Sequence, residues 1–180
     1  KHFGLDPIVC TSMDPSDDIL EEIAYNQDVK VFRGSMLNKL KRWYDCCNQY
    51  NIEKFHTVDA DDPFFDGQLM KKSFMLLNEG YDVICPTESS SLGAASVGYS
   101  LTKTIVSKAL ELVEEEENTE MIWYYLERVK NLRKIVLPDP TENPVKVRLT
   151  LDYEEDYWLL QTIRNILGNW KIIYSTGGGV

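Results

Sequence analysis

The chain has 180 residues, a hydrophobic fraction of 43% and a formal net charge of -10 at pH 7. These values fit one soluble globular domain with a sizeable core. The acidic excess argues against a nucleic-acid-binding face, which needs basic residues, but it permits a small phosphorylated substrate held by a few local cations. No apolar run approaches the roughly 20 residues that span a bilayer, and no signal peptide opens the chain. We therefore expect a cytoplasmic protein with neither nucleic-acid nor membrane partners.

In the first third of the chain, short apolar runs alternate with amphipathic stretches. We expect strands at 8–11, 29–32 and 52–58, and helices at 17–27 and 35–50. Ser35 is placed to cap the second of these helices. Because strands and helices alternate, the pattern predicts an α/β fold with a mostly parallel sheet and helices on its faces.

The alternation continues in the rest of the chain. We expect helices at 66–78, 103–117 and 121–130, strands at 82–85, 97–101, 133–137 and 145–151, and a last helix ending near Leu167. Gly80 should end the first of these helices. Residues 87–95 are rich in Ser, Gly and Ala, and we expect them to form a loop.

Four carboxylates gather where the strand at 52–58 ends. They are Asp59, Asp61, Asp62 and Asp66. Ligands bind α/β sheets at the carboxyl ends of strands, and Mg²⁺ is usually held by one or two carboxylates together with substrate phosphates. The same residues also fit a solvated turn in which Asp66 caps the next helix. Both interpretations remain open at this stage.

A second acidic strand end follows residues 145–151, at Asp152. If the two strands are neighbours in the sheet, Asp61 and Asp152 converge from opposite sides on one cation. The alternative is that Asp152 caps the last helix, whose first turn is also acidic and therefore suits the positive end of the helix dipole.

Several blocks, in this order along the chain, resemble the sugar-acid cytidylyltransferases, and most closely the spore-coat polysaccharide and acylneuraminate branch. The blocks are Ile8-Val9-Cys10-Thr11-Ser12 with Asp17-Asp18 after it, Val31-Phe32-Arg33-Gly34-Ser35, Leu40-Lys41-Arg42-Trp43-Tyr44, Asp61-Asp62-Pro63 followed by Phe64-Phe65-Asp66, and Arg148-Leu149-Thr150-Leu151-Asp152 with Glu155-Asp156. The second and last blocks, at this separation, are the most specific. The resemblance implies a Rossmann-like nucleotidyltransferase fold and the transfer of CMP from CTP to a sugar or sugar acid, with release of pyrophosphate, for polysaccharide or glycoconjugate synthesis.

The resemblance also implies roles for particular residues. Asp61 and Asp152 would hold Mg²⁺ against the triphosphate, with Arg148 beside them in the catalytic group. The nucleotide would be bound by Thr11, Ser12, Arg33 and Arg42, and the sugar by Asp62 and Glu120. Each arginine can instead form an ion pair with a neighbouring acid. A homodimer is a further expectation from the resemblance.

The sequence departs from the family pattern at two places. Family members begin with a strand and a Gly-rich loop bearing Arg and Lys, and nothing before Ile8 matches that element. We therefore expect a single nucleotidyltransferase-like domain over residues 1–180 that is incomplete at its N-terminus. In the sugar half, Glu120 is followed by Met121 where close relatives carry His, so the sugar is not identified.

Two other classes of protein remain open. One is a degenerate nucleotidyltransferase fold that serves as a binding or regulatory subunit. The other is a metal-dependent glycosyltransferase-like domain, since Asp59-Ala60-Asp61 fits an Asp-x-Asp metal motif. The sequence encoded upstream of Lys1 distinguishes them, because a strand followed by a Gly-rich basic loop there indicates the nucleotidyltransferase.

Overall fold

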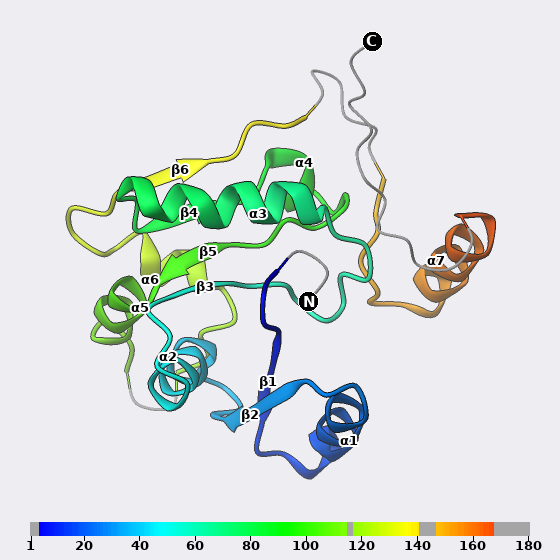
Figure 1. Cartoon of the computed structure of the whole chain (residues 1–180), viewed down its shortest axis with the longest axis horizontal. Coiled ribbons are helices and arrows are strands. Elements are labelled where there is room, and N and C mark those ends of the chain that lie inside the picture. The colour runs from blue at the N-terminus through cyan, green and yellow to red at the C-terminus, as the bar shows by residue number, and fades with distance from the viewer. Residues whose placement is uncertain (1–3, 115–116, 141–146, 168–180) are drawn as a thin grey trace. The chain divides into compact units, whose positions relative to one another are not determined.

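The computed structural model describes residues 4–114, 117–140 and 147–167 (Figure 1). Two compact units are formed, and each consists of two stretches of the chain. The first unit contains residues up to Phe55 together with Leu101–Leu132, and the second contains His56–Ser100 together with residues from Arg133 onward.

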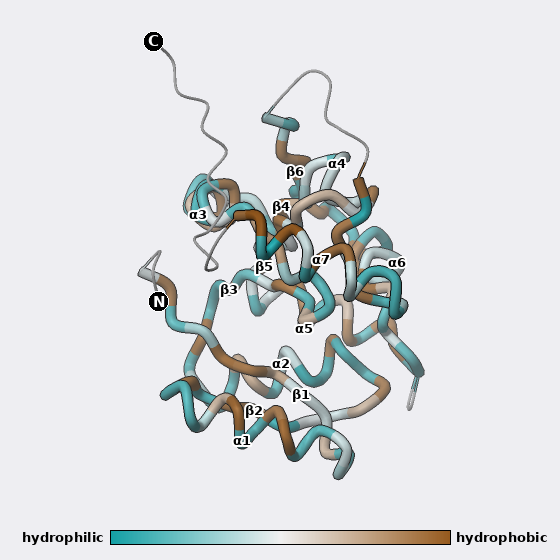
Figure 2. Tube along the Cα trace, turned by 90° about the vertical axis from the view of Figure 1, so that its right-hand side faces the viewer, coloured by the Kyte–Doolittle hydropathy of each residue, from teal (hydrophilic) through white to brown (hydrophobic). Residues whose placement is uncertain are grey.

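The first unit begins with two parallel strands. Strand β1 (Ile8–Ser12) pairs in parallel with β2 (Lys30–Gly34), from Ile8 opposite Lys30 to Ser12 opposite Gly34. Helix α1 (Asp18–Asn26) connects them, as a parallel pair requires a crossover. Figure 2 shows α1 with alternating hydrophobic and hydrophilic stretches, as expected for an amphipathic helix.

The core of the first unit lies among three further helices. These are α2 (Lys39–Gln49), α5 (Lys103–Leu110) and α6 (Ile122–Leu126). Their buried apolar residues include Leu40, Trp43, Cys46, Cys47, Ile105, Val106, Ala109, Ile122, Tyr125 and Leu126. The spacing of three and four residues along α2 and α5 explains why one face of each helix is buried.

The second unit contains strands β4 (Val83–Cys85) and β6 (Lys134–Val136), which pair in parallel. It also contains the end of β3 (Lys54–His56) and the start of β5 (Ser100–Thr102). The sheet has the order β3-β5-β4-β6. Its apolar core is Leu77, Ile84, Val97 and Leu137, with Leu69, Phe74, Leu76, Tyr81 and Ile135 packed against it.

Helices of the second unit begin and end at recognisable signals. Asp66 caps α3 (Gly67–Leu76), which continues as the 3₁₀ turn η2 (Leu77–Glu79) and ends at Gly80 with φ +90°. This ending confirms the predicted role of Gly80. Helix α7 (Glu154–Leu167) is the last described element.

Several local predictions were wrong. Helix α6 ends at Leu126 rather than near residue 130, and strand β5 begins at Ser100 rather than at residue 97. Helix α2 begins at Lys39 because Asn38 caps it, while the Ser35 hydroxyl accepts the Asn38 N–H. Residues 87–95 contain the short helix α4 (Glu88–Ser91), since the Thr87 side chain caps it. Helix α5 ends at Leu110, before the glutamate run. The strand expected at 145–151 is not formed in its described part, residues 147–151.

The fold class was predicted correctly. The chain is an α/β protein with a Rossmann-like arrangement of parallel strand pairs and helices. Among the described residues, none of the helices combines the length and the apolar character that crossing a membrane requires.

Candidate functional site

The acidic turn after β3 is held in place by backbone bonds within the second unit. Ser96 N–H donates to the Phe64 carbonyl at 2.8 Å, and Asp66 N–H donates to the Ser96 carbonyl at 2.9 Å. The Asp66 carboxylate accepts the N–H groups of Gln68 and Leu69, each at 3.0 Å. Asp66 is therefore used as the helix cap, and Asp59, Asp61 and Asp62 are left as the acidic groups of the turn.

Residues 148–152 lie directly beside this turn. Leu151 N–H donates to the Asp61 carbonyl at 2.8 Å, and Leu149 N–H donates to the Gly93 carbonyl at 2.7 Å. Asp152, the next residue after Leu151, is thus placed next to Asp61. The two acidic segments are joined by a backbone hydrogen bond, but residues 147–151 are not a strand of the sheet, and a shared cation between Asp61 and Asp152 stays a prediction.

The carboxylates of the second unit influence one another electrostatically. Burial raises the pKa of Asp62, and a hydrogen bond from Ser96 opposes this rise. The negative charges of Asp61, Asp59 and Asp152 raise the pKa of Asp62 further. Four carboxylates from two segments therefore share one region, and their mutual repulsion favours binding of a cation.

Arg148 links this region to the start of α7. One guanidinium nitrogen, Nη1, donates to both oxygens of Asp156 at 2.6 and 2.9 Å, and Nη2 donates to Asp152. The Asp156 carboxylate also accepts the N–H groups of Asp152 and Tyr153, both at 2.9 Å. Asp156 is buried, whereas Asp152 and Arg148 are about half exposed, at 46% and 44% of their side chains. These contacts make Asp156 the fixed centre of the segment.

A half-buried histidine, His56, lies at the base of the turn. His56 Nε2 is 2.5 Å from the Val97 carbonyl, so this nitrogen carries the proton and Nδ1 accepts the Ser100 hydroxyl at 2.7 Å. Ser73 in turn donates to Ser100 at 2.8 Å. Burial lowers the pKa of His56 to about 4, although its bond to Val97 acts in the opposite direction. His56 is therefore neutral at pH 7 and packs in the fold rather than acting as a base.

The acidic region has ligands of the type that Mg²⁺ prefers, but they are few. Within residues 4–114, 117–140 and 147–167, no three His, Cys, Asp or Glu side chains form a group that could hold a metal ion. Asp61 and Asp152 are both exposed. Two exposed carboxylates fit a Mg²⁺ ion that takes its remaining ligands from water and substrate phosphates.

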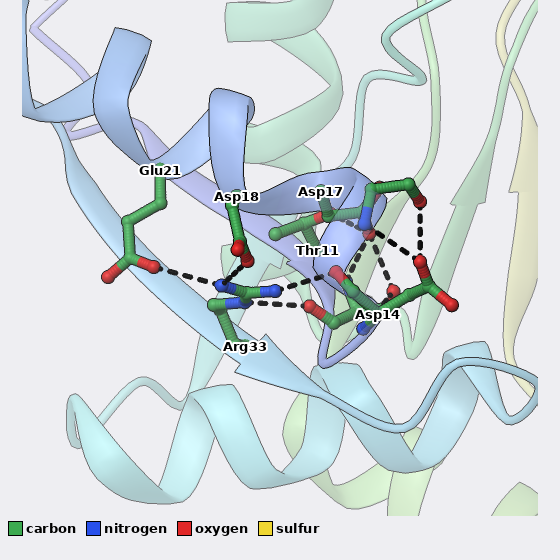
Figure 3. Close-up of polar contacts among 8 residues, drawn as sticks. Thr11, Asp14, Asp17, Asp18, Glu21 and Arg33 are labelled. Carbon is green, nitrogen blue, oxygen red and sulfur yellow. Dashed lines mark hydrogen bonds and ion pairs between the residues drawn. The ribbon is translucent and has the colours of Figure 1, made fainter.

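The predicted nucleotide-binding residues Thr11, Ser12 and Arg33 lie together in the first unit, at the carboxyl ends of β1 and β2 (Figure 3). The Asp17 carboxylate accepts the hydroxyls of Thr11 and Ser12, both at 2.6 Å, and the Ser12 N–H at 3.0 Å. The bonds from Ser12 Oγ, Thr11 Oγ1 and Ser12 N–H lower the pKa of Asp17 to about 2, with Ser12 Oγ contributing most to the shift. Asp17 belongs to the first block that resembles the family, but no role in the site was predicted for it.

Arg33 is surrounded by acceptors of its own chain (Figure 3). Its Nη1 contacts Asp18 at 2.6 Å and Glu21 at 3.1 Å. Its other nitrogens donate to the carbonyls of Ser12 at 2.9 Å and Asp14 at 2.8 Å. The bonds to Asp18 and Glu21 raise the pKa of Arg33. Arg33 therefore connects β2 to α1, which is the ion-pair alternative, and its role in binding a nucleotide stays a prediction.

Arg42 and Glu120 are held at α2, in the same unit. Arg42 Nη1 donates to the carbonyls of Ser35 at 2.8 Å and Met36 at 3.3 Å, and its buried Nε has no hydrogen-bond partner among the described residues. Glu120 forms an ion pair with the buried Lys39 at 2.9 Å. The roles predicted for Arg42 and Glu120 likewise stay predictions.

Sequence reasoning overlooked Asp156 as a site residue, although a signal was present. With α7 beginning at Glu154, Asp156 is the third helical residue, and an acid there often accepts the N–H of the capping residue. Ser96 carried no such signal, because its contact with Asp62 depends on the fold. Both residues position the acidic segments.

Comparison with known proteins supports the fold. No family model matches the sequence. An uncharacterized protein of Methanocaldococcus jannaschii is 28% identical over 157 residues, which are 86% of this chain and 63% of that protein. The structure is similar to that of a cytidylyltransferase from Leptospira borgpetersenii serovar Hardjo-bovis, with a TM-score of 0.75 and 25% identity over 88% of this chain and 68% of that chain. The two chains share a fold. The present chain thus spans less than two thirds of the curated relative.

Proposed function

We propose that the protein is a cytidylyltransferase that transfers CMP from CTP to a sugar or sugar acid, with Mg²⁺ as its cofactor. The similarity to the Leptospira cytidylyltransferase supports CTP-dependent nucleotidyl transfer. The acceptor follows from the resemblance of the sequence blocks to sugar-acid cytidylyltransferases, and so does a role in polysaccharide or glycoconjugate synthesis.

One observation carries the proposal beyond the fold. The backbone hydrogen bond of 2.8 Å from Leu151 N–H to the Asp61 carbonyl joins the segments that carry Asp61 and Asp152, which supports a role for both as metal ligands. Asp61 and Asp152 are 91 positions apart in the sequence. A turn that served only solvation would not require this juxtaposition.

The reaction requires attack of an acceptor oxygen on the α-phosphorus of CTP. A bond forms between these atoms, the bond from the α-phosphorus to the bridging oxygen breaks, and pyrophosphate leaves. Asp61 and Asp152 would hold Mg²⁺, which when bound neutralises triphosphate charge and favours in-line attack. Arg148 supplies a positive charge beside Asp152. Asp62 has a raised pKa and lies beside the same carboxylates, where it can accept a hydrogen bond from the acceptor.

Residues of the first unit are proposed to bind the nucleotide. The hydroxyls of Thr11 and Ser12 are oriented by Asp17 at the end of β1. Each hydroxyl donates to Asp17 and keeps acceptor capacity for a nucleotide N–H or O–H group. Arg33 and Arg42 add positive charge to this unit.

The test is pyrophosphate release by the full-length protein with Mg²⁺, CTP and a panel of sugar acids and amino sugars. We expect release with CTP and at least one acceptor, and much slower release with ATP or GTP. Equal rates with all nucleotides would contradict the cytidine assignment. An absence of release with every acceptor would favour a regulatory subunit, and transfer from a nucleotide sugar would favour the glycosyltransferase class.

A further inference from the structure

The Asp152 carboxylate already has a cationic partner within the chain. Its Oδ2 atom accepts Arg148 Nη2, and it also accepts the Thr150 hydroxyl at 3.0 Å. Arg148 lies over the ring of Tyr153, with 5.2 Å from the guanidinium carbon to the ring centroid. Any other cation that binds Asp152 must therefore share this carboxylate with Arg148 or displace it.

Asp156 determines where Arg148 lies. Its carboxylate is buried, with 11% of the side chain exposed, and it binds Arg148 through both oxygens. Two backbone N–H groups at the start of α7 fix the same carboxylate. When Arg148 releases Asp152, its two bonds to Asp156 can remain, so the guanidinium stays close to the carboxylate that it has left.

We infer that Arg148 is a built-in competitor for the divalent cation at Asp152, and that Asp156 is the positioning residue that shares the guanidinium with Asp152 and retains it when Arg148 releases Asp152. The inference depends on the proposed function only in taking Asp152 as a metal-binding carboxylate. Arg148 balances the repulsion among the acidic side chains when no metal is bound. The same contact weakens metal affinity, because binding must break or weaken an ion pair.

The test measures binding of Mn²⁺ alone to the full-length protein, by calorimetry or by electron paramagnetic resonance, without nucleotide. We expect Arg148→Gln to bind Mn²⁺ roughly three- to tenfold more tightly than the wild type, since a half-exposed ion pair and one nearby positive charge are removed. Raising the salt concentration should shrink this difference. Arg128→Gln is the matched control, because Arg128 contacts Tyr124 in the first unit and its loss changes the net charge equally. It should leave the Mn²⁺ affinity unchanged.

Asp156 is tested through a double-mutant cycle. Asp156→Asn should weaken Mn²⁺ binding when Arg148 is present, because Arg148 then interacts more strongly with Asp152. In the Arg148→Gln background, the same change should have a much smaller effect, since its influence acts through Arg148. A purely structural role of Asp156 would give equal losses in both backgrounds.

Unchanged or weaker Mn²⁺ binding by folded Arg148→Gln would overturn the inference, and so would an absence of binding by both proteins. If Arg148→Gln does not fold, as judged by circular dichroism, Arg148→Lys is used in its place. Its single ammonium cannot replace the two-pronged contact of the guanidinium, so this variant should bind Mn²⁺ more tightly than the wild type. Unchanged or weaker binding by Arg148→Lys would likewise overturn the inference. Pyrophosphate release by the wild type is measured separately. Failure of that assay would reject the proposed function, whereas equal Mn²⁺ affinities would reject only the competition.

Discussion

Each unit contains a cluster of carboxylates near one arginine, and the two clusters differ in how their charge is balanced. In the first unit, Asp17 accepts three donors from Thr11 and Ser12, while Arg33 binds Asp18 and Glu21. In the second unit, Asp59, Asp61, Asp62 and Asp152 influence one another electrostatically, and Arg148 contacts Asp152. The side chain of Arg33 is 17% exposed and that of Arg148 is 44% exposed, so the second cluster is the more open to an added cation.

This difference separates a structural cluster from a candidate site containing the same residue types. Arg33 has an acceptor for each of its three nitrogens, so it connects strand β2 to helix α1. Arg148 binds two of the acids beside it, Asp152 and Asp156, but not Asp61. The way in which a group of acids is balanced by its own chain is therefore a better indication of cation binding than the number of acids alone.

The largest effect should follow from removing a charge in the second cluster. Asp61→Asn and Asp152→Asn keep the side-chain shape, but each removes one proposed metal ligand charge. We expect the rate of pyrophosphate release to fall by at least about a hundredfold, because the lost interaction stabilises charge in the transition state. Steady-state assays with CTP and the best acceptor measure this.

Asp45→Asn is the matched control for these two variants. Asp45 forms an exposed ion pair with Lys41 on α2, so its loss changes the charge without touching either cluster. It should retain the wild-type rate. Full activity of Asp61→Asn would remove the distinction between the clusters, since the acids of the second unit would then be dispensable as well.

Much of the fold could be predicted because its signals are local. The apolar runs of β1 and β2, the Asp66 cap and the Gly80 ending depend on residues close together in the sequence. The strand expected at 145–151 failed for the opposite reason. Its alternating pattern is real, but whether such a segment becomes a strand depends on long-range pairing, and its described bonds go to Asp61 and Gly93 instead.

The candidate site was predictable only in part. Asp61 and Asp152 could be paired from the sequence because both follow apolar runs and match family blocks. The bonds of Asp17 to Thr11 and Ser12, and of Arg148 to Asp156, depend on side-chain geometry that no spacing rule specifies. The difference between the two clusters therefore required the structure.

Gly98→Ala should cause the next largest effect, by disturbing the base of the second cluster. Gly98 has φ +73°, and an added Cβ would lie 1.7 Å from the Thr57 carbonyl oxygen and 3.2 Å from His56 Nε2. We expect a loss of about 3 kcal/mol or more in the free energy of unfolding, measured with urea.

Gly4→Ala separates the clash from the backbone strain. Gly4 has a similar φ, +74°, but no atom lies within 4 Å of an added Cβ. It should cost only about 1 kcal/mol, the usual strain of a left-handed conformation. Equal losses for both variants would show that the close approach to Thr57 contributes nothing to the stability of the turn.

A smaller, pH-dependent effect is expected from His56. Its pKa is about 4 in the folded chain and near 6.5 when unfolded, so below pH 6.5 the unfolded state takes up the proton first. Stability from the neutral ring is complete above pH 6.5 and is lost as the pH falls toward 4, with about 2 kcal/mol lost between pH 6.5 and 5. The free energy of unfolding of the wild type and of His56→Gln is measured with urea at several pH values. The contribution of His56 is the difference between the two proteins in how steeply this free energy changes with pH. Parallel pH profiles would show that His56 does not titrate as its burial predicts.

Asp17→Asn should have the smallest effect, and it tests whether the first cluster is structural. The amide has one oxygen in place of two and brings an N–H₂ group toward the hydroxyls of Thr11 and Ser12, so the melting temperature at pH 7 should fall modestly. The pKa of Asp17 is about 2 in the fold and 3.8 as its ordinary value. The difference in melting temperature between the wild type and Asp17→Asn should therefore be constant above about pH 5. It should shrink as the pH falls below 4, because protonation of Asp17 then weakens the same bonds in the wild type.

The Mn²⁺ affinity of Asp17→Asn should equal that of the wild type, since the Asp17 carboxylate already has its donors within the chain, whereas Asp152→Asn should bind Mn²⁺ more weakly. A loss of Mn²⁺ binding in Asp17→Asn would mean that the first cluster also binds a cation, and that the contrast between the two units does not hold.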